Sequence, residues 1–180
     1  MRVAIISDIH DNVWKLDAAL AALPTADAII CCGDLCSPFI IHQMGRGFAK
    51  PIHIVFGNND GDLYRITANA RLYPQIKLHG EWFRDEFEGR TVAAHHFDNV
   101  ACALSGGGEF DLLCFGHNHI YSITRVGRTL AVNPGSIMGA IFAGDGKRTD
   151  TVSTFAVYDT ASGEARGFEI SNRFEVVDRP

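Results

Sequence analysis

The sequence predicts an α/β fold with a partly parallel sheet. Up to Ala70, short runs rich in Ile and Val alternate with segments whose apolar residues follow helical spacing. Gly, Asn and Asp follow most of the apolar runs, and these residues favour the turns that leave a strand. With 180 residues, of which 47% are hydrophobic, the chain can bury a core without disulfides. We expect a single domain over residues 1–180.

The first part of the chain should alternate three strands with three helices. The first helix, for example, carries Leu16, Leu20 and Leu23 on one face, and Pro24 follows its end. The predicted strands are Arg2–Ser7, Asp27–Cys32 and Pro51–Phe56, and the predicted helices are Asn12–Leu23, Pro38–Phe48 and Asp60–Ala70.

After Ala70 the pattern becomes richer in short strands. We expect a hairpin region at Ile76–Glu88, strands at Arg90–His95 and Phe110–Phe115, and a helix at Asp98–Leu104. Later strands are expected at Ile120–Val126, Thr129–Asn133, Ser153–Tyr158, Arg166–Ile170 and Phe174–Val177. Their alternating pattern and Gly-containing turns favour an antiparallel second sheet. Met138–Asp150 carries Gly, Asp, Lys and Arg and is predicted to be a mobile loop.

The charge balance excludes several classes of protein. The formal net charge is −5, which argues against a large basic surface for nucleic acid and against a polybasic membrane anchor. No apolar run approaches the ~20 residues that span a bilayer, and the start of the chain turns acidic too early for a signal peptide. We therefore expect a cytoplasmic protein with no membrane partner. The five cysteines form no Cys-x-x-Cys pair and are predicted to be reduced thiols rather than disulfides or zinc ligands.

Five of the predicted strands are each followed by residues that can bind a metal ion. In chain order, these residues are Asp8 and His10, Asp34, Asn58 and Asn59, His95 and His96, and finally His117 and His119. If the strands share one sheet, their carboxyl ends bring these side chains to one edge. The spacing in Asp8-x-His10 and His117-x-His119 puts both members of each pair on one face of an extended backbone.

The donor set mixes imidazole nitrogens with hard oxygens and contains no thiolate. Counting one of the two asparagines and one of the two adjacent histidines, seven groups remain; they exceed the four ligands of one tetrahedral ion and suit two divalent ions that share a carboxylate. Gly33, Gly57 and Gly116 precede three of the ligand positions, where they allow tight turns and leave room for an ion. We expect two divalent metal ions, with Mn as the first choice and Ni, Fe or Zn as alternatives.

The motifs Asp8-x-His10, Gly33-Asp34, Gly57-Asn58 and Gly116-His117-x-His119, with a His between the last two, resemble the calcineurin-like metallophosphoesterases. The resemblance covers about residues 1–160. The short length and Asn133-Pro134-Gly135-Ser136 are similar to the compact bacterial and archaeal phosphodiesterase branch. This resemblance implies a four-layer α/β/β/α sandwich of the metallo-dependent phosphatase type, with two mixed sheets flanked by helices.

The resemblance also implies roles for individual residues. One ion would be held by Asp8, His10 and His119, and the other by Asn58, His117 and one histidine of the pair His95–His96, with Asp34 as the bridge. Counting from the turn at Gly89 selects His96 and puts His95 where the family usually has Thr. The implied catalytic residues are Asp34, Asn58 and His96, and the implied substrate contacts are Asn12, Asn59 and Ser136. Asp60 and Asp98 are candidate acceptors for the second N–H of the histidine ligands.

The resulting hypothesis is a binuclear metal-dependent phosphoesterase. It would hydrolyse small phosphodiesters, with phosphomonoesters as alternative substrates, by in-line attack of a hydroxide that bridges the two ions. Larger relatives often have His where this chain has Asn59, an amide that is no acid at neutral pH. Either good leaving groups should be favoured, or another acid should take the place of this His. The alternative is a catalytically silent interaction module on the same fold, which predicts damaged ligand positions. A homo-oligomer is compatible with the sequence.

Overall fold

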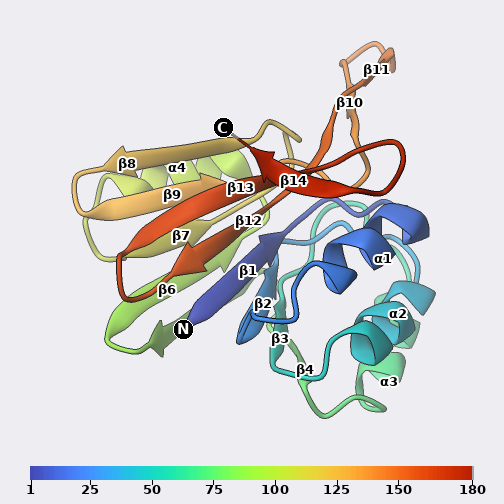
Figure 1. Cartoon of the computed structure of the whole chain (residues 1–180), viewed down its shortest axis with the longest axis horizontal. Coiled ribbons are helices and arrows are strands. Elements are labelled where there is room, and N and C mark those ends of the chain that lie inside the picture. The colour runs from blue at the N-terminus through green and yellow to red at the C-terminus, as the bar shows by residue number, and fades with distance from the viewer. Residues whose placement is uncertain (180) are drawn as a thin grey trace.

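Two β-sheets packed face to face form the centre of the molecule. The computed structural model describes residues 1–179, and within this range the large sheets have seven strands and five strands. The first sheet has the order β14-β13-β12-β1-β2-β3-β4, and the second has the order β5-β6-β7-β9-β8. Figure 1 shows α1, α2 and α3 grouped on the outer face of the first sheet, and α4 behind the second.

The strands of the first sheet are β1 (Arg2–Ile6), β2 (Ala28–Cys31), β3 (Ile52–Ile54), β4 (Ile76–Leu78), β12 (Ser153–Asp159), β13 (Glu164–Ile170) and β14 (Val176–Arg179). Those of the second are β5 (Trp82–Phe87), β6 (Arg90–His95), β7 (Leu112–Cys114), β8 (Ser122–Val126) and β9 (Thr129–Asn133). The helices are α1 (Val13–Ala21), α2 (Phe39–Gly47), α3 (Leu63–Ala70) and α4 (Asp98–Ser105), and a separate hairpin contains β10 (Ala140–Phe142) and β11 (Arg148–Asp150).

The four-layer prediction is confirmed, because alternate residues of the same strands belong to different cores. In β1, Ala4 and Ile6 pack into the core beneath the helices, whereas Val3 and Ile5 pack into the core between the sheets. On the far side, α4 covers the second sheet through a third, smaller apolar cluster. Central strands such as β2, β7 and β9 are buried on both faces, as expected for a sheet covered by helices.

The parallel part of each sheet positions the site. Strands β1 to β4 are parallel to one another, and so are β6, β7 and β9. The edge strands β5 and β8, and the run β12 to β14, pair in the antiparallel sense. The carboxyl ends of β1, β2 and β3 therefore lie at one edge of the first sheet, and those of β6 and β7 lie at one edge of the second.

Two predictions about strand pairing are wrong. Ile76–Glu88 is not a hairpin, because β4 joins the first sheet beside β3 and β5 begins the second sheet. The hairpin connects β5 and β6 through Glu88 and Gly89, which both have positive φ. The late strands also do not form a sheet of their own. β12 pairs with β1 inside the first sheet and is accordingly buried on both faces, while β8 and β9 join the second sheet.

The segment Met138–Asp150 is not only a loop. Strands β10 and β11 pair in the antiparallel sense and form a hairpin that projects from the body of the molecule (Figure 1). All three side chains of β11 are exposed, so apolar alternation, the usual strand signal, is missing from its sequence. No helix among the described residues is long and apolar enough to cross a membrane.

Candidate metal centre

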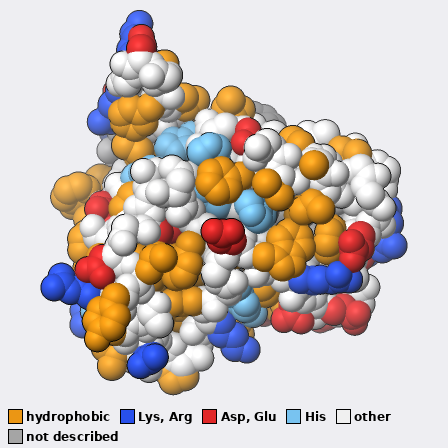
Figure 2. All heavy atoms as spheres, turned by 180° about the vertical axis from the view of Figure 1, so that it is seen from behind, with side chains coloured by type: hydrophobic (Ala, Val, Ile, Leu, Met, Phe, Trp, Pro, Cys, Tyr) orange, Lys and Arg blue, Asp and Glu red, His pale blue; other side chains and the backbone are white. Residues whose placement is uncertain are grey.

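The loops that follow β1, β2, β3, β6 and β7 meet at one place. The sequence prediction assumed a single sheet, but three of these strands belong to the first sheet and two to the second. The two sheets face each other, so the loops still converge. In Figure 2, histidine side chains gather at the surface beneath the projecting hairpin.

A first cluster of ligand atoms contains Asp8, His10 and His119. Asp8 Oδ1 lies 3.2 Å from His119 Nε2, and the Nε2 atoms of His10 and His119 are also 3.2 Å apart. His10 Nε2 lies 3.3 Å from Asp34 Oδ2, which connects this cluster to the next. Three residues that come from two different sheets thus direct their donor atoms at one point.

A second cluster contains Asp8, Asp34 and His96. His96 Nε2 lies 3.6 Å from Asp34 Oδ2. Asn58 joins this cluster, because its amide Oδ1 lies 2.9 Å from His96 Nε2 and 2.9 Å from His117 Nδ1. Asp34 therefore has contacts in both clusters, which is the arrangement expected of a carboxylate shared by two ions.

Of the two adjacent histidines, the structure brings His96 into the cluster. His96 is fully buried, and its Nδ1–H donates to the carbonyl of Cys32 at 2.7 Å. This bond fixes the ring and leaves Nε2 directed at Asp34 and Asn58. His95 points elsewhere: its Nδ1 accepts the backbone N–H of Phe97 at 3.1 Å.

The sequence had suggested that the second ring nitrogens of the histidine ligands bond to Asp60 or Asp98. For His10 and His119 the structure shows other partners. The Nδ1–H of His119 donates to the carbonyl of Ala140, and His10 Nδ1 lies 3.5 Å from the thiol of Cys36. Asp60 instead accepts the backbone N–H groups of Asp34, Cys36 and Gly57 at 2.8–3.0 Å. It therefore ties the loop after β2 to the loop after β3. Asp98 accepts the side-chain N–H of Asn118 at 2.8 Å.

The electrostatics of the first cluster fit a cation. Asp8 is fully buried, and its Oδ1 accepts no hydrogen bond of good geometry, although His119 Nε2 lies 3.2 Å away. Burial alone would raise the pKa of Asp8, but His10 and His119 outweigh this effect and hold it below its ordinary value. Burial alone would lower the pKa of His10, yet Asp34 and Asp8 raise it to about 11. Buried carboxylate charge with an unpaired oxygen is what a divalent ion would neutralise, so the residues present fit such ions.

The backbone at these positions is unusual. Asp8, His10, Asp34, His117 and His119 all have positive φ, between 43° and 72°. This left-handed region is sparsely populated by residues other than Gly, and such residues concentrate at functional sites. The conformation is needed because each loop must turn sharply at its strand end and direct a side chain back over the sheet edge.

The glycines of the motifs make room for neighbouring chain segments. A Cβ on Gly33 would lie 2.6 Å from the backbone nitrogen of Gly57 and 3.0 Å from His96 Nδ1, and a Cβ on Gly116 would lie 2.5 Å from Asp8 Oδ2. These glycines were predicted to allow tight turns and to leave room for an ion, and the φ of 99° at Gly33 agrees with the first reason. The structure adds a further reason, which is the close approach of the ligand-bearing loops to one another.

Comparison with known proteins agrees with this geometry. Residues 1–163 match the family described as the calcineurin-like phosphoesterase superfamily domain. The chain belongs to this family. It is 24% identical over 171 residues to the phosphodiesterase MJ0936 of Methanocaldococcus jannaschii, a match that covers 92% of this chain and 97% of the relative.

Solved structures show the same fold. A structure described as a novel archaeal phosphodiesterase superposes with a TM-score of 0.81 and 22% identity, over 94% of this chain and 99% of that one. Vps29 of Entamoeba histolytica in complex with Zn²⁺ superposes with a TM-score of 0.69 and 18% identity, over 99% and 97% of the two chains. This calcineurin-like chain thus shares its architecture both with a phosphodiesterase and with a vacuolar protein sorting protein.

The three residues predicted to contact substrate have different surroundings. Asn59 lines a cavity of about 450 Å³ above the two clusters, and its backbone and side-chain N–H groups donate to the two oxygens of Asp34 at 2.8 Å. Asn12 caps α1 and donates to the carbonyl of Met138 at 3.2 Å. Ser136 is buried and donates to the carbonyl of Asp8 at 3.1 Å. Among the described residues that line the cavity, neither Asn12 nor Ser136 appears.

Three residues that line this calcineurin-like cavity were not predicted from the sequence, namely Asn118, Ile141 and Phe142. Asp98 also lines it, although the sequence had suggested it as an acceptor for a histidine N–H. Asn118 could have been found, because it lies between two predicted ligands. Ile141 and Phe142 gave no comparable signal, since they belong to the hairpin that was predicted as a loop.

Proposed function

We propose that this chain is a metal-dependent phosphoesterase that hydrolyses small phosphodiesters. The observation that carries the proposal is the pair of ligand clusters, both in contact with Asp34, on the floor of one cavity. Family membership and the phosphodiesterase relative support the same chemistry. The size of the cavity, about 450 Å³, suits a small substrate.

The ligands divide naturally into two sets. We assign one ion to Asp8, His10 and His119 and the other to Asn58, His96 and His117, with Asp34 contributing to both. The carbonyl bonds made by Nδ1 of His96 and His119 support this assignment, because they leave Nε2 free to coordinate. The mixed donor set accepts Mn²⁺, Ni²⁺, Fe²⁺ and Zn²⁺, of which we propose Mn²⁺ first, and Zn²⁺ is the ion named for the Vps29 structure.

Two bound divalent ions supply a hydroxide nucleophile at neutral pH and neutralise charge on the phosphoryl oxygens. The residues of the chain prepare the site for this chemistry. Asn59 holds both oxygens of Asp34, and the buried carbonyl of Cys32 holds His96, so the shared ligands keep their orientation. Asp98 and Asn118 form the polar wall beside the bound ester.

The choice of leaving group follows from Asn59. Its backbone N–H and its side-chain amide donate to Asp34, and an amide transfers no proton to a departing alkoxide. We therefore propose that substrates with good leaving groups are preferred, since these depart without an acid.

The proposal is tested by metal analysis and hydrolysis together. We expect about two divalent ions per chain by elemental analysis. Mn²⁺ should stimulate hydrolysis of bis(p-nitrophenyl) phosphate more than hydrolysis of p-nitrophenyl phosphate. A protein that retains no metal and hydrolyses neither ester would contradict the proposal.

The likeness to Vps29 supports a second candidate, a protein-interaction module without turnover. Such a module has no need for intact ligands, whereas every predicted ligand position in this chain holds a residue that can bind a metal, and the structure gathers them. Metal binding without hydrolysis of either ester would favour the module.

A further inference from the structure

The lining of the cavity above the two clusters has two kinds of side chain. Predicted metal ligands contribute to it together with the polar residues Asp98 and Asn118. Its apolar lining comes from β10, which supplies Ile141 and Phe142. A substrate bound in this cavity would therefore meet polar groups and an aromatic ring.

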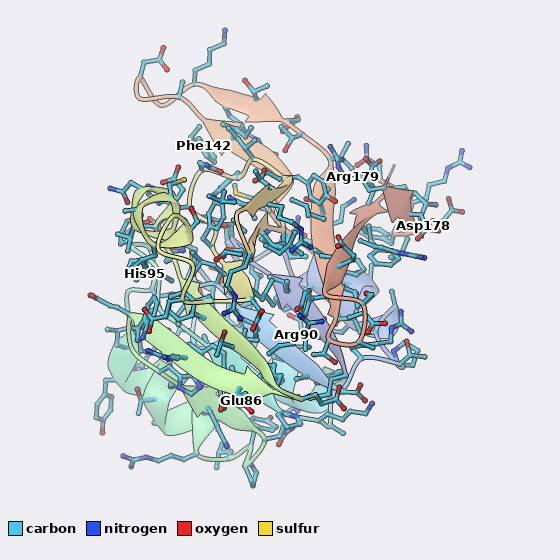
Figure 3. All side chains as sticks on the ribbon, turned by 90° about the vertical axis from the view of Figure 1, so that its left-hand side faces the viewer. Glu86, Arg90, His95, Phe142, Asp178 and Arg179 are labelled. Atoms are coloured by element: carbon cyan, nitrogen blue, oxygen red, sulfur yellow. The ribbon has the colours of Figure 1, made fainter. Side chains whose placement is uncertain are left out.

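Phe142 is a large apolar side chain that is about half exposed to solvent. It is 49% exposed, and Figure 3 places it where the hairpin leaves the body of the molecule, above α4. Along β10, Ala140 is buried, Ile141 is partly buried and Phe142 is exposed. Core formation does not explain this aromatic ring, because half of its surface is exposed and it lines a cavity whose other residues are mostly charged or polar.

The base of the hairpin is fastened to the ligand loops. The backbone N–H of Met138 donates to the carbonyl of Asp8 at 3.0 Å, and that of Ile137 donates to the carbonyl of Ser7 at 3.1 Å. The imidazole of His119 donates to the carbonyl of Ala140, two residues before Phe142. Because the bonded residues include two predicted metal ligands, the position of the Phe142 ring is set relative to the metal centre.

We propose that Phe142, together with Ile141, binds an aromatic ester group of the substrate, so that the site selects aryl phosphodiesters over alkyl ones. This inference rests on the proposed phosphodiesterase function. An aromatic pair adds affinity beyond its buried area, and the ring of Phe142 is available for such a pair. Aryl oxides are also good leaving groups, which matches the absence of an acid at Asn59.

The test uses two non-hydrolysable ligands that differ only in the group attached to phosphorus. Phenylphosphonate and methylphosphonate carry the same anionic head for the metal centre. Titration calorimetry on the Mn²⁺-loaded protein should show that phenylphosphonate binds about tenfold more tightly, which corresponds to about 1.4 kcal/mol. In Phe142→Ala this preference should fall to about twofold or less, while the affinity for methylphosphonate stays unchanged.

Two further variants control the measurement. Phe142→Tyr keeps the aromatic ring and should keep the preference. Phe39, on α2, is 47% exposed and does not line this cavity, so Phe39→Ala should also keep it. Equal affinities of the wild type for the two phosphonates would overturn the inference and leave the proposed function standing. A Phe142→Ala variant that keeps the preference for phenylphosphonate would also overturn the inference, even if its oligomeric state changes. Absence of both phosphonate binding and diester hydrolysis would overturn the two together.

Discussion

Two pairs of histidine rings in this molecule approach each other equally closely, although the first pair is tilted by 58° and the second is stacked at 20°. His10 and His119 approach within 3.2 Å through their Nε2 atoms, and His53 Nδ1 approaches His79 Nε2 within 3.1 Å. The first pair lies at the carboxyl ends of β1 and β7. The second pair is associated with β3 and β4, where the rings pack against Phe83 of the second sheet at centroid distances of 4.7 Å.

The neighbours of the two pairs give them opposite properties. Asp34 and Asp8 raise the pKa of His10 to about 11 in spite of burial. His53 lies among Phe83, Phe87 and His79, and burial lowers its pKa to about 4. The pKa of His79 is lowered too, again by burial. The first pair is therefore suited to a site in which imidazole rings lie beside carboxylates, whereas the rings of the second pair stay neutral inside the fold. Histidine content alone indicates neither role; the nearby carboxylates distinguish them.

The largest expected effect comes from removing the carboxylate that both clusters share. Asp34→Asn keeps the size of the side chain but removes its charge. The metal-centre histidines then lose one of the carboxylates that distinguish their surroundings from those of His53 and His79. We expect kcat/KM for the diester to fall by at least about 10³-fold and metal content to fall to one ion or fewer. Asp178→Asn, an exposed carboxylate far along the chain on β14, should change neither quantity. Full activity in Asp34→Asn would exclude the shared-ligand role.

The adjacent histidines give a matched pair of variants. His96→Ala removes a buried ligand and should lower metal affinity and activity by about 10²-fold or more. His95→Ala removes a side chain outside both clusters and should stay within about twofold of the wild type. Diester hydrolysis at increasing Mn²⁺ concentration measures both. If His95→Ala is the damaging change, the assignment of His96 is wrong.

The buried pair should make stability depend on pH. His53 has a folded pKa of about 4 against an ordinary value of 6.5, so it stays neutral in the folded protein while the unfolded chain takes up a proton below pH 6.5. The stability contributed by the neutral ring is present above pH 6.5 and is lost as the pH falls toward 4.

His53→Phe removes this group and retains an aromatic ring against Phe83. Between pH 7 and pH 5, the free energy of unfolding of the wild type should fall by roughly 2 kcal/mol more than that of the variant. Urea unfolding at the two pH values measures the difference, and contributions from the metal centre cancel because both proteins contain it. Parallel pH dependences would show that His53 is not responsible.

The smallest expected effect comes from adding a histidine to the metal centre. In Asn59→His an imidazole replaces the amide that contacts Asp34, and it could protonate a departing alkoxide. We expect the rate on a diester with an alkyl leaving group to rise about tenfold relative to the rate on a nitrophenyl diester. Asn59→Ala separates this effect from the loss of the bonds to Asp34, since it removes those bonds and adds no acid. An unchanged ratio of rates would refute the leaving-group argument.

Much of the fold could be predicted because local pattern and tertiary role agree in the first half. The run Arg2–Ile6 is apolar and short, and it does form a parallel strand, as do the runs that became β2 and β3. The four-layer arrangement followed from the family resemblance and not from periodicity. That residues 1–180 form one domain stays a prediction.

Strand pairing could not be predicted from pattern. β4 and β5 lie three residues apart in the chain and read as a hairpin, yet they belong to different sheets, because pairing depends on partners distant in sequence. For the same reason β12 could not be placed beside β1. The apolar pattern of β12 does not indicate which strand, more than a hundred residues away, it pairs with.

In the candidate site, residues that end strands were predictable and residues that line its walls were not. Asp34 and His117 each follow an apolar run and one glycine, so their positions at strand ends could be predicted. Their convergence also requires the two sheets to face each other, which the strand pattern does not show. Phe142 reaches the cavity through a hairpin whose tip and second strand are polar and exposed, so its position depends on contacts at the hairpin base. The metal roles of the predicted ligands stay predictions until metal content is measured.

The left-handed backbone at Asp8, His10, Asp34, His117 and His119 has a consequence for how the protein responds to its ions. Each such residue destabilises the folded chain by about 1 kcal/mol or more, whether or not a metal is present. An ion that binds only the folded form offsets this cost by mass action. The melting temperature should therefore rise with free Mn²⁺ concentration, and a chelator should lower it. Metal supply would then influence the stability of the folded protein as well as its activity.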